Sequence, residues 1–174
     1  MIERKIEQAL NDQINAELYS AYLYYAMVAY CESVGLSGCA HWMKLQALEE
    51  VGHAEKFAAF INERGGRVRL KAIDVPPSEW ESPIAVFEAV REHEAKVTSL
   101  IHKLVDLAVR ESDHATNNFL QWFVGEQVEE EASAGEIVQK LKLAGSAPGG
   151  LFQVDQLLGQ RPLVLPTTLS GEGK

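Results

Sequence analysis

The sequence predicts an all-α protein: a four-helix bundle with one long crossover and a short fifth helix near its C-terminal end. Four long segments repeat apolar residues with helical periodicity, and Pro and Gly gather between these segments. One connection is also long enough to run the length of a bundle. With 174 residues, the chain is expected to form a single domain over 1–174, with the bundle at about 4–144 and a tail at 161–174.

The long helices are expected at about 4–32, 39–64, 83–111 and 114–144. The first and third connections are short, which places the helices that they join antiparallel. Asp113 precedes the fourth helix and is expected to cap it. Pro83 fits the first turn of the third helix.

The second connection contains a stretch of 16 residues, RVRLKAIDVPPSEWES, between Gly66 and Pro83. Fully extended, such a stretch spans roughly 50 Å, whereas a helix of ~28 residues is roughly 42 Å long. The connection can therefore return along the whole bundle, so that the second and third helices run parallel.

A shorter helix is expected at about 150–160, after the sequence APGG. Leu151, Val154 and Leu158 share one face of it. Packing on the chain's own bundle is the simpler interpretation of this apolar face, and a contact with another subunit is the functional one.

Composition excludes several classes of partner. The formal net charge is −9, from 25 acidic and 16 basic residues, which argues against a nucleic-acid partner. No apolar run approaches the ~20 residues of a membrane span, and MIERKIEQAL does not resemble a signal peptide. A cytoplasmic protein with no membrane partner is expected. Cys31 and Cys39 form no CxxC site or disulfide framework, and are expected to be reduced packing residues.

The first three long helices each place a carboxylate within their apolar stripe. Glu17 lies in the stripe of the first helix, Glu50 in that of the second and Glu94 in that of the third. His53 lies one turn beyond Glu50. One such acid alone would more often be structural, but the pattern repeats in every helix.

The fourth helix carries the stretch GEQVEEEASAGE. At 100° per residue, Glu126 lies about 40° from Glu130, and Glu129 lies about 100° from it. We therefore expect Glu126, Glu129 and Glu130 to face the bundle interior. Glu131 is expected at the margin of the stripe.

A buried, unpaired carboxylate is costly, so it must be protonated, paired with a base or bound to a metal. The four stripes carry almost no Lys or Arg that could neutralise these acids. Carboxylate oxygens together with one imidazole suit two divalent iron ions. The pattern therefore favours a metal centre over incidental charge.

An internal repeat supports this interpretation. Glu17 and Glu50 are 33 residues apart, as are Glu94 and Gln127, and the two halves of the chain superpose with a shift of 77. Di-iron carboxylate bundles carry one Glu on each of two helices and Glu-x-x-His on each of the other two. The first half contains Glu50-x-x-His53, and the second half contains an altered version, Gln127-x-x-Glu130.

These motifs resemble those of the non-haem bacterial and archaeal ferritins. The resemblance covers nearly the whole chain, from QINAELYSAYLY through EEVGHAEKF and PPSEW to FLQWFVGEQVEEEAS. Bacterioferritins have Glu and His at the positions of Gln127 and Glu130, and a haem-ligating Met at the position of Gly52, so no haem is expected. The CxxC domain of rubrerythrins and the intersubunit site of mini-ferritins do not match this chain.

The resemblance implies a role for each candidate residue in a two-iron centre. Glu17 and His53 would bind the first iron, Glu50 would bridge the two ions, and Glu94 and Glu130 would hold the second.

Further roles are implied around this centre. Gln127 would form hydrogen bonds beside it, and Glu49, Glu126 and Glu129, with Glu130, resemble a third iron site. Tyr24 resembles the tyrosine beside such centres, where a redox or hydrogen-bonding role and a packing role are equally expected. Trp122 is more simply a core aromatic residue.

The activity implied by the resemblance is oxidation of Fe(II) by dioxygen, followed by storage of Fe(III) mineral inside a hollow shell of 24 identical subunits. The alternative is a di-iron carboxylate enzyme that acts on peroxide or an organic substrate. It would need a substrate pocket or an electron donor, and the chain is accounted for by the bundle and the fifth helix. A purely structural bundle is the weakest hypothesis.

Overall fold

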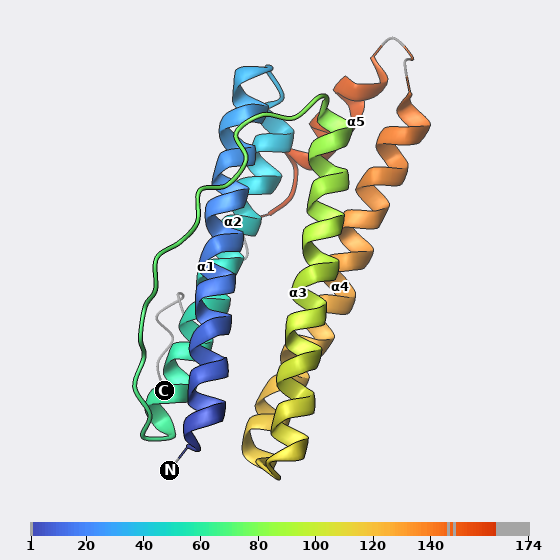
Figure 1. Cartoon of the computed structure of the whole chain (residues 1–174). Helices are drawn as coiled ribbons and strands as arrows, with labels where there is room; N and C mark the ends of the chain where they lie inside the picture. Colours follow the sequence, from blue (N-terminus) through green and yellow to red (C-terminus); the bar gives the residue numbers. More distant parts are fainter. Residues whose placement is uncertain (1, 146, 148, 163–174) are drawn as a thin grey trace.

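The computed structural model describes residues 2–145, 147 and 149–162. They form five α-helices: α1 (Arg4–Ser33), α2 (Ser37–Glu63), α3 (Pro83–Arg110), α4 (His114–Ala144) and α5 (Gly150–Leu158) (Figure 1). The predicted all-α class is confirmed, and each helix begins and ends within two residues of its predicted bounds. Most of the predicted tail lies outside the described residues, and the division into a single domain stays a prediction.

The ends of the long helices carry the caps that the sequence indicated. Asp113 Oδ1 accepts a hydrogen bond from Thr116 N at 3.0 Å, as predicted for an N-cap. The same carboxylate binds Arg64 through Nη1 at 3.1 Å and Nη2 at 3.2 Å. The C-terminal end of α2 is therefore tied to the beginning of α4. At the start of α3, Ser82 accepts from Ala85 N at 3.3 Å and Pro83 occupies the first turn.

The crossover returns along the bundle, so that α2 and α3 run parallel, as predicted (Figure 1). It lies against α1, where the Asn11 side chain donates to Arg67 O at 3.1 Å and accepts from Arg69 N at 2.5 Å. Lys71 forms an ion pair with Asp12 of the same helix. These contacts satisfy backbone groups of a segment that has no secondary structure of its own.

Two apolar clusters fill the bundle and leave a polar layer between them. One contains Tyr24, Met43 and Phe87, and the other contains Leu10 and Phe57, together with their neighbours. In each long helix, a stretch that belongs to neither cluster lies between the two, and every predicted ligand falls in such a stretch. Burial of each large apolar side chain contributes ~1.5–3 kcal/mol, which offsets the cost of the polar layer.

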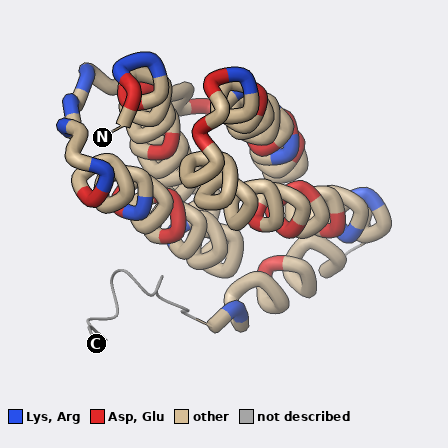
Figure 2. Tube along the Cα trace, turned by 90° about the horizontal axis from the view of Figure 1, so that it is seen from below, with Lys and Arg blue, Asp and Glu red and all other residues tan. Residues whose placement is uncertain are grey.

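Helix α5 packs outside the four-helix arrangement, against α2 and α4 (Figure 2). Asp155 Oδ1 accepts a hydrogen bond from Cys39 N at 2.8 Å, in the first turn of α2. A Cβ atom at Gly38 would lie 1.8 Å from Asp155 O, so only glycine allows this approach. Val154 and Leu158 are buried, which confirms that the apolar face packs on the chain's own bundle.

The charged residues of Figure 2 lie along all four long helices and the crossover. None of the described helices combines the length and apolar character needed to cross a membrane. Cys31 and Cys39 are both buried free thiols within the apolar cluster around Tyr24, as expected for packing residues.

Candidate metal centre

The polar layer gathers acidic side chains from all four long helices. Glu17 comes from α1, Glu50 from α2 and Glu94 from α3, and all three are at most 1% exposed. His53 lies one helical turn beyond Glu50, and its Nδ1 is 3.4 Å from Glu50 Oε2. From α4, Glu130 enters the layer at its partly exposed edge.

Glu17, Glu50 and His53 form a compact group of potential metal ligands. Each offers one ligand atom, and these atoms all lie within 4.8 Å of one another. Such a spacing allows one cation to contact all three side chains. The group lies in the interior, where a bound cation is shielded from bulk water.

Two carboxylate oxygens in this group have no hydrogen-bond partner among the described residues. Gln13 Nε2 donates to Glu17 Oε1 at 2.9 Å, but Glu17 Oε2 and Glu50 Oε2 are buried and form no hydrogen bond, although His53 Nδ1 lies 3.4 Å from Glu50 Oε2. Burial raises the pKa of Glu17 well above its ordinary value, and the nearby charge of Glu50 raises it further. Carboxylates held in this state would be stabilised by a divalent cation, which supplies the missing partner to both.

Glu94 differs from Glu17 and Glu50 because donors already hold both of its oxygens. The Tyr24 hydroxyl donates to Glu94 Oε1, and Gln127 Nε2 donates to Glu94 Oε2 at 3.2 Å. Burial nevertheless raises the pKa of Glu94, against the lowering effect of these two donors. The hydrogen bonds fix the orientation of the carboxylate within the polar layer.

Glu130 belongs to the same polar layer but is not one of the three residues whose ligand atoms lie within 4.8 Å of one another. Burial raises the pKa of Glu130 to about 7, with further contributions from the charges of Glu94 and Glu49. Gln46 Nε2 donates to Glu130 Oε2 at 2.7 Å. Burial also raises the pKa of Glu50, and the charges of Glu94 and Glu130 add to this rise. The layer thus brings four carboxylates and an imidazole together, although only Glu17, Glu50 and His53 meet within 4.8 Å.

Comparisons with known proteins agree with this geometry. Residues 7–144 match the family described as Ferritin-like domain. A bacterial non-heme ferritin from Bacteroides fragilis is 52% identical over 161 residues, which cover 92% of this chain and all of the relative. The chain belongs to the ferritin family.

Other ferritins show the same likeness in sequence and structure. A bacterial non-heme ferritin from Campylobacter jejuni is 39% identical, over 91% of this chain and 95% of its own. The solved structure of an open pore ferritin from Archaeoglobus fulgidus matches with a TM-score of 0.92 at 55% identity. It covers 93% of this chain and 100% of the archaeal chain. These relatives confirm the resemblance that the sequence motifs indicated.

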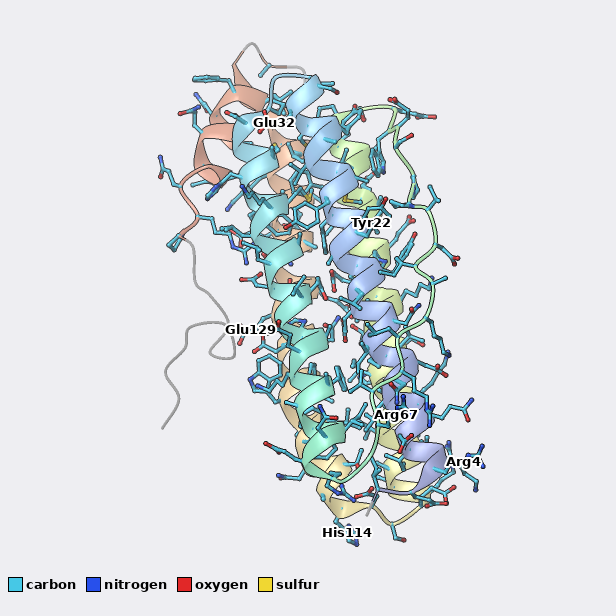
Figure 3. All side chains as sticks on the ribbon, turned by 90° about the vertical axis from the view of Figure 1, so that its left-hand side faces the viewer. Arg4, Tyr22, Glu32, Arg67, His114 and Glu129 are labelled. Atoms are coloured by element: carbon cyan, nitrogen blue, oxygen red, sulfur yellow. The ribbon has the colours of Figure 1, made fainter. Side chains whose placement is uncertain are left out.

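The outer acids of this ferritin, Glu49, Glu126 and Glu129, differ in how far their side chains are exposed to solvent. Glu49 is held by Arg161, whose Nη2 lies 3.0 and 2.7 Å from its two oxygens. Glu126 is partly buried, and burial raises its pKa. Glu129 is exposed at the surface of the bundle (Figure 3), so the expectation that it faces the interior was wrong. Its place about 100° from the centre of the stripe puts it beyond the packed face.

Two other expectations for α4 have different outcomes. Glu131 is exposed, as expected at a margin, and accepts a hydrogen bond from Thr98 Oγ1 at 2.5 Å. Trp122 is 40% exposed, so its expected place in the core was wrong. Its ring meets the His53 ring edge-on at 5.5 Å, and Lys56 Nζ lies 3.5 Å from its centroid. Trp122 therefore packs against the His53 ring.

Three residues that hold the ligands in place were not predicted from the sequence: Gln13, Gln46 and Arg161. Gln13 precedes Glu17 by four residues, and Gln46 precedes Glu50 by four. Gln13 donates to the ligand that it precedes, so this spacing could have revealed its role. Gln46 shares a helix face with Glu50 but donates to Glu130 of another helix, which the spacing does not indicate. Arg161 follows the last helix and has no periodic pattern around it, so no local signal marks its contact with Glu49.

Proposed function

We propose that Glu17, Glu50, His53, Glu94 and Glu130 bind two Fe(II) ions as the substrate of an oxidation by dioxygen. Iron storage and ferroxidase activity follow from membership of the ferritin family. The observation that carries the assignment to these residues is the Glu17–Glu50–His53 group, with its two buried carboxylate oxygens that lack a donor.

Charge balance supports a pair of divalent ions. When deprotonated, the four carboxylates carry about −4, which matches two Fe(II) ions. Burial and mutual repulsion raise the pKa of Glu17, Glu50, Glu94 and Glu130, so Fe(II) competes with protons for these sites. Once the oxidised ions leave, protons can replace them, which avoids an accumulation of uncompensated charge in the interior.

Hydrogen-bond donors keep the ligands in place between turnovers. Gln13 holds Glu17, Gln46 holds Glu130, and Tyr24 and Gln127 hold Glu94 from two sides. The side chains that bind iron thus retain their orientation without it, which reduces the reorganisation needed on binding. Iron itself supplies the redox chemistry, and the chain supplies the ligand set and the access route.

The outer acids extend this site toward the surface. Glu49, Glu126 and Glu129, with Glu130, form a proposed third iron site, and the exposure of Glu129 opens it to solvent. Iron that passes along these residues would reach the interior of a hollow shell and form mineral there. Ferritins form oligomeric shells, and we propose a shell of 24 copies of this chain, without haem.

The test compares ligand variants with matched surface changes. His53→Ala and Glu130→Ala should each reduce the initial rate of Fe(II) oxidation by about 100-fold or more, because they remove direct ligands. His102→Ala and Glu92→Ala change exposed residues of α3 and should leave the rate within about twofold of the parent. A rate that survives both ligand changes would refute the assignment of the centre.

A second measurement separates storage from the alternative, a di-iron enzyme acting on peroxide or an organic substrate. Gel filtration followed by aerobic addition of Fe(II) should show a large assembly that develops a rusty absorbance and retains its iron. A small oligomer that turns over an organic substrate and stores no iron would instead favour the alternative.

A further inference from the structure

Arg161 lies three residues beyond the end of α5 and reaches back to the polar layer. Its Nη2 donates to both oxygens of Glu49, at 3.0 and 2.7 Å, and its Nη1 donates to Gln46 Oε1. Its guanidinium carbon is 5.1 Å from the centroid of the Trp42 ring. One guanidinium thus bridges two side chains that are 112 and 115 residues away in sequence.

The contact with Gln46 extends to a proposed iron ligand. Because Gln46 Oε1 accepts from Arg161, its amide nitrogen faces the other way and donates to Glu130 Oε2 at 2.7 Å. The guanidinium therefore binds one acid of the outer site directly and a second through an amide. The Arg161 guanidinium therefore places a positive charge at the position beside Glu49 where the proposed function requires an iron ion.

The fold holds Arg161 in this place from several sides. The Arg161 carbonyl lies 2.8 Å from His41 Nε2, and α5 is fixed by the Asp155–Cys39 hydrogen bond and the burial of Val154 and Leu158. The Arg161 side chain is 26% exposed and the Glu49 side chain 23% exposed. The guanidinium therefore has room to move toward solvent while its backbone stays in place.

We propose that Arg161 is the internal counter-ion of the outer iron site, and that a cation binds Glu49 by displacing its guanidinium. A guanidinium that donates to both carboxylate oxygens occupies the lone pairs that a metal would use. Two positive charges on one carboxylate also repel each other. Arg161 thereby weakens retention of iron at the outer site and favours its onward transfer. This inference rests on the proposed outer site.

The test measures Zn²⁺ binding to the assembled protein by titration calorimetry, in the parent and in Arg161→Gln. Zn²⁺ is redox-inert, so binding is read without oxidation. Loss of the competing charge should tighten the outer class of sites on the order of 10-fold. Affinity at the two-ion centre should change by less than about twofold. Arg161→Lys keeps the charge and should stay close to the parent. Arg110→Gln removes an exposed guanidinium at the end of α3 and controls for net charge.

Equal outer-site binding in Arg161→Gln would overturn the proposal, since the guanidinium would then not compete with the metal. Weaker binding would also overturn it, because it would show that the guanidinium positions Glu49 for the metal. A crystal soaked in Zn²⁺ provides an independent reading, in which the guanidinium should no longer contact Glu49. Glu49→Ala should abolish one class of Zn²⁺ sites in the titration, and this loss identifies that class as the outer site. If Glu49→Ala changes neither the number nor the affinity of any class of Zn²⁺ sites, the proposal of an outer site is wrong, and the inference about Arg161 fails with it.

Discussion

Gln127 Nε2 lies 3.2 Å from Glu94 Oε2 and 3.3 Å from Glu94 O, so α4 donates a hydrogen bond to the carboxylate of α3. In the internal repeat, Gln127 occupies the position that corresponds to Glu50. The Gln127 amide therefore donates a hydrogen bond at the position where the first half has Glu50, whose ionised carboxylate can only accept hydrogen bonds. The two halves of the polar layer are asymmetric for this reason.

Gln127→Glu preserves the shape of the side chain and replaces its donor with a second carboxylate beside Glu94. Because the charge of the new carboxylate disfavours ionisation of Glu94, Fe(II) oxidation should shift to higher pH. At pH 6.5 the initial rate should fall by roughly 10-fold, as for other partners of metal ligands. Stopped-flow absorbance over pH 6–8 measures this change. Gln121→Glu, at an exposed position of α4, is the control, and an identical pH profile in both variants would refute the role of Gln127.

Tyr24→Phe removes the hydroxyl that donates to Glu94 and keeps the buried ring. The pKa of Glu94 should rise further, because this donor lowers it in the parent. We expect slower Fe(II) oxidation, by about 10-fold at neutral pH, with the fold unchanged. Tyr22→Phe, at a residue that is 51% exposed on the same helix (Figure 3), should have no effect. Equal rates in the two variants would leave Tyr24 with a packing role alone.

The stability of the metal-free protein should fall as pH rises. Glu130 has a pKa of about 7 in the folded chain, against an ordinary value of 4.5. The folded state therefore holds a proton that the unfolded state releases between these values. The associated stabilisation is complete below about pH 4.5 and is lost as pH rises through 7, on the order of 3 kcal/mol.

Thermal unfolding at pH 5.5 and 7.5 measures this loss. Glu130→Gln cannot ionise, so its melting temperature should decline less between these values than that of the parent. The metal-free state must be secured with a chelator, because Fe(II) or Zn²⁺ would stabilise the charged form. A parallel decline in both proteins would contradict the raised pKa.

Glu129→Ala separates the outer site from the two-ion centre. Glu129 is exposed and lies away from the Glu17–Glu50–His53 group, so the initial rate should stay within about twofold of the parent. The number of Fe(II) ions oxidised per dioxygen, or the rate of later turnovers, should change. Glu131→Ala removes an exposed acid two residues away and serves as the control. If neither quantity differs between the two variants, the outer site does not include Glu129.

The sequence could predict the helices because their signals are local. The apolar stripes, the Asp113 cap and the length of the crossover each depend on neighbouring residues, and all three appear in the structure. The acids in the stripes were also predictable, since an ionisable residue on an apolar face is costly wherever the helices meet.

Other features depended on contacts between distant segments. Angles on a helical wheel could not show how far the packed face extends, so Glu129 and Trp122 were placed too deep. Arg161 reaches Glu49 only because α5 folds back on α2, and nothing around residue 161 indicates such a contact. Non-local hydrogen bonds of this kind require the three-dimensional structure.

The most direct test of the central claim is a crystal of the protein soaked anaerobically in Fe(II), with anomalous scattering at the iron edge. We expect two neighbouring iron peaks inside each subunit. One should lie among Glu17, Glu50 and His53, and the other should lie among Glu50, Glu94 and Glu130. Iron found only at the surface or between subunits, with these five side chains unchanged, would contradict this claim.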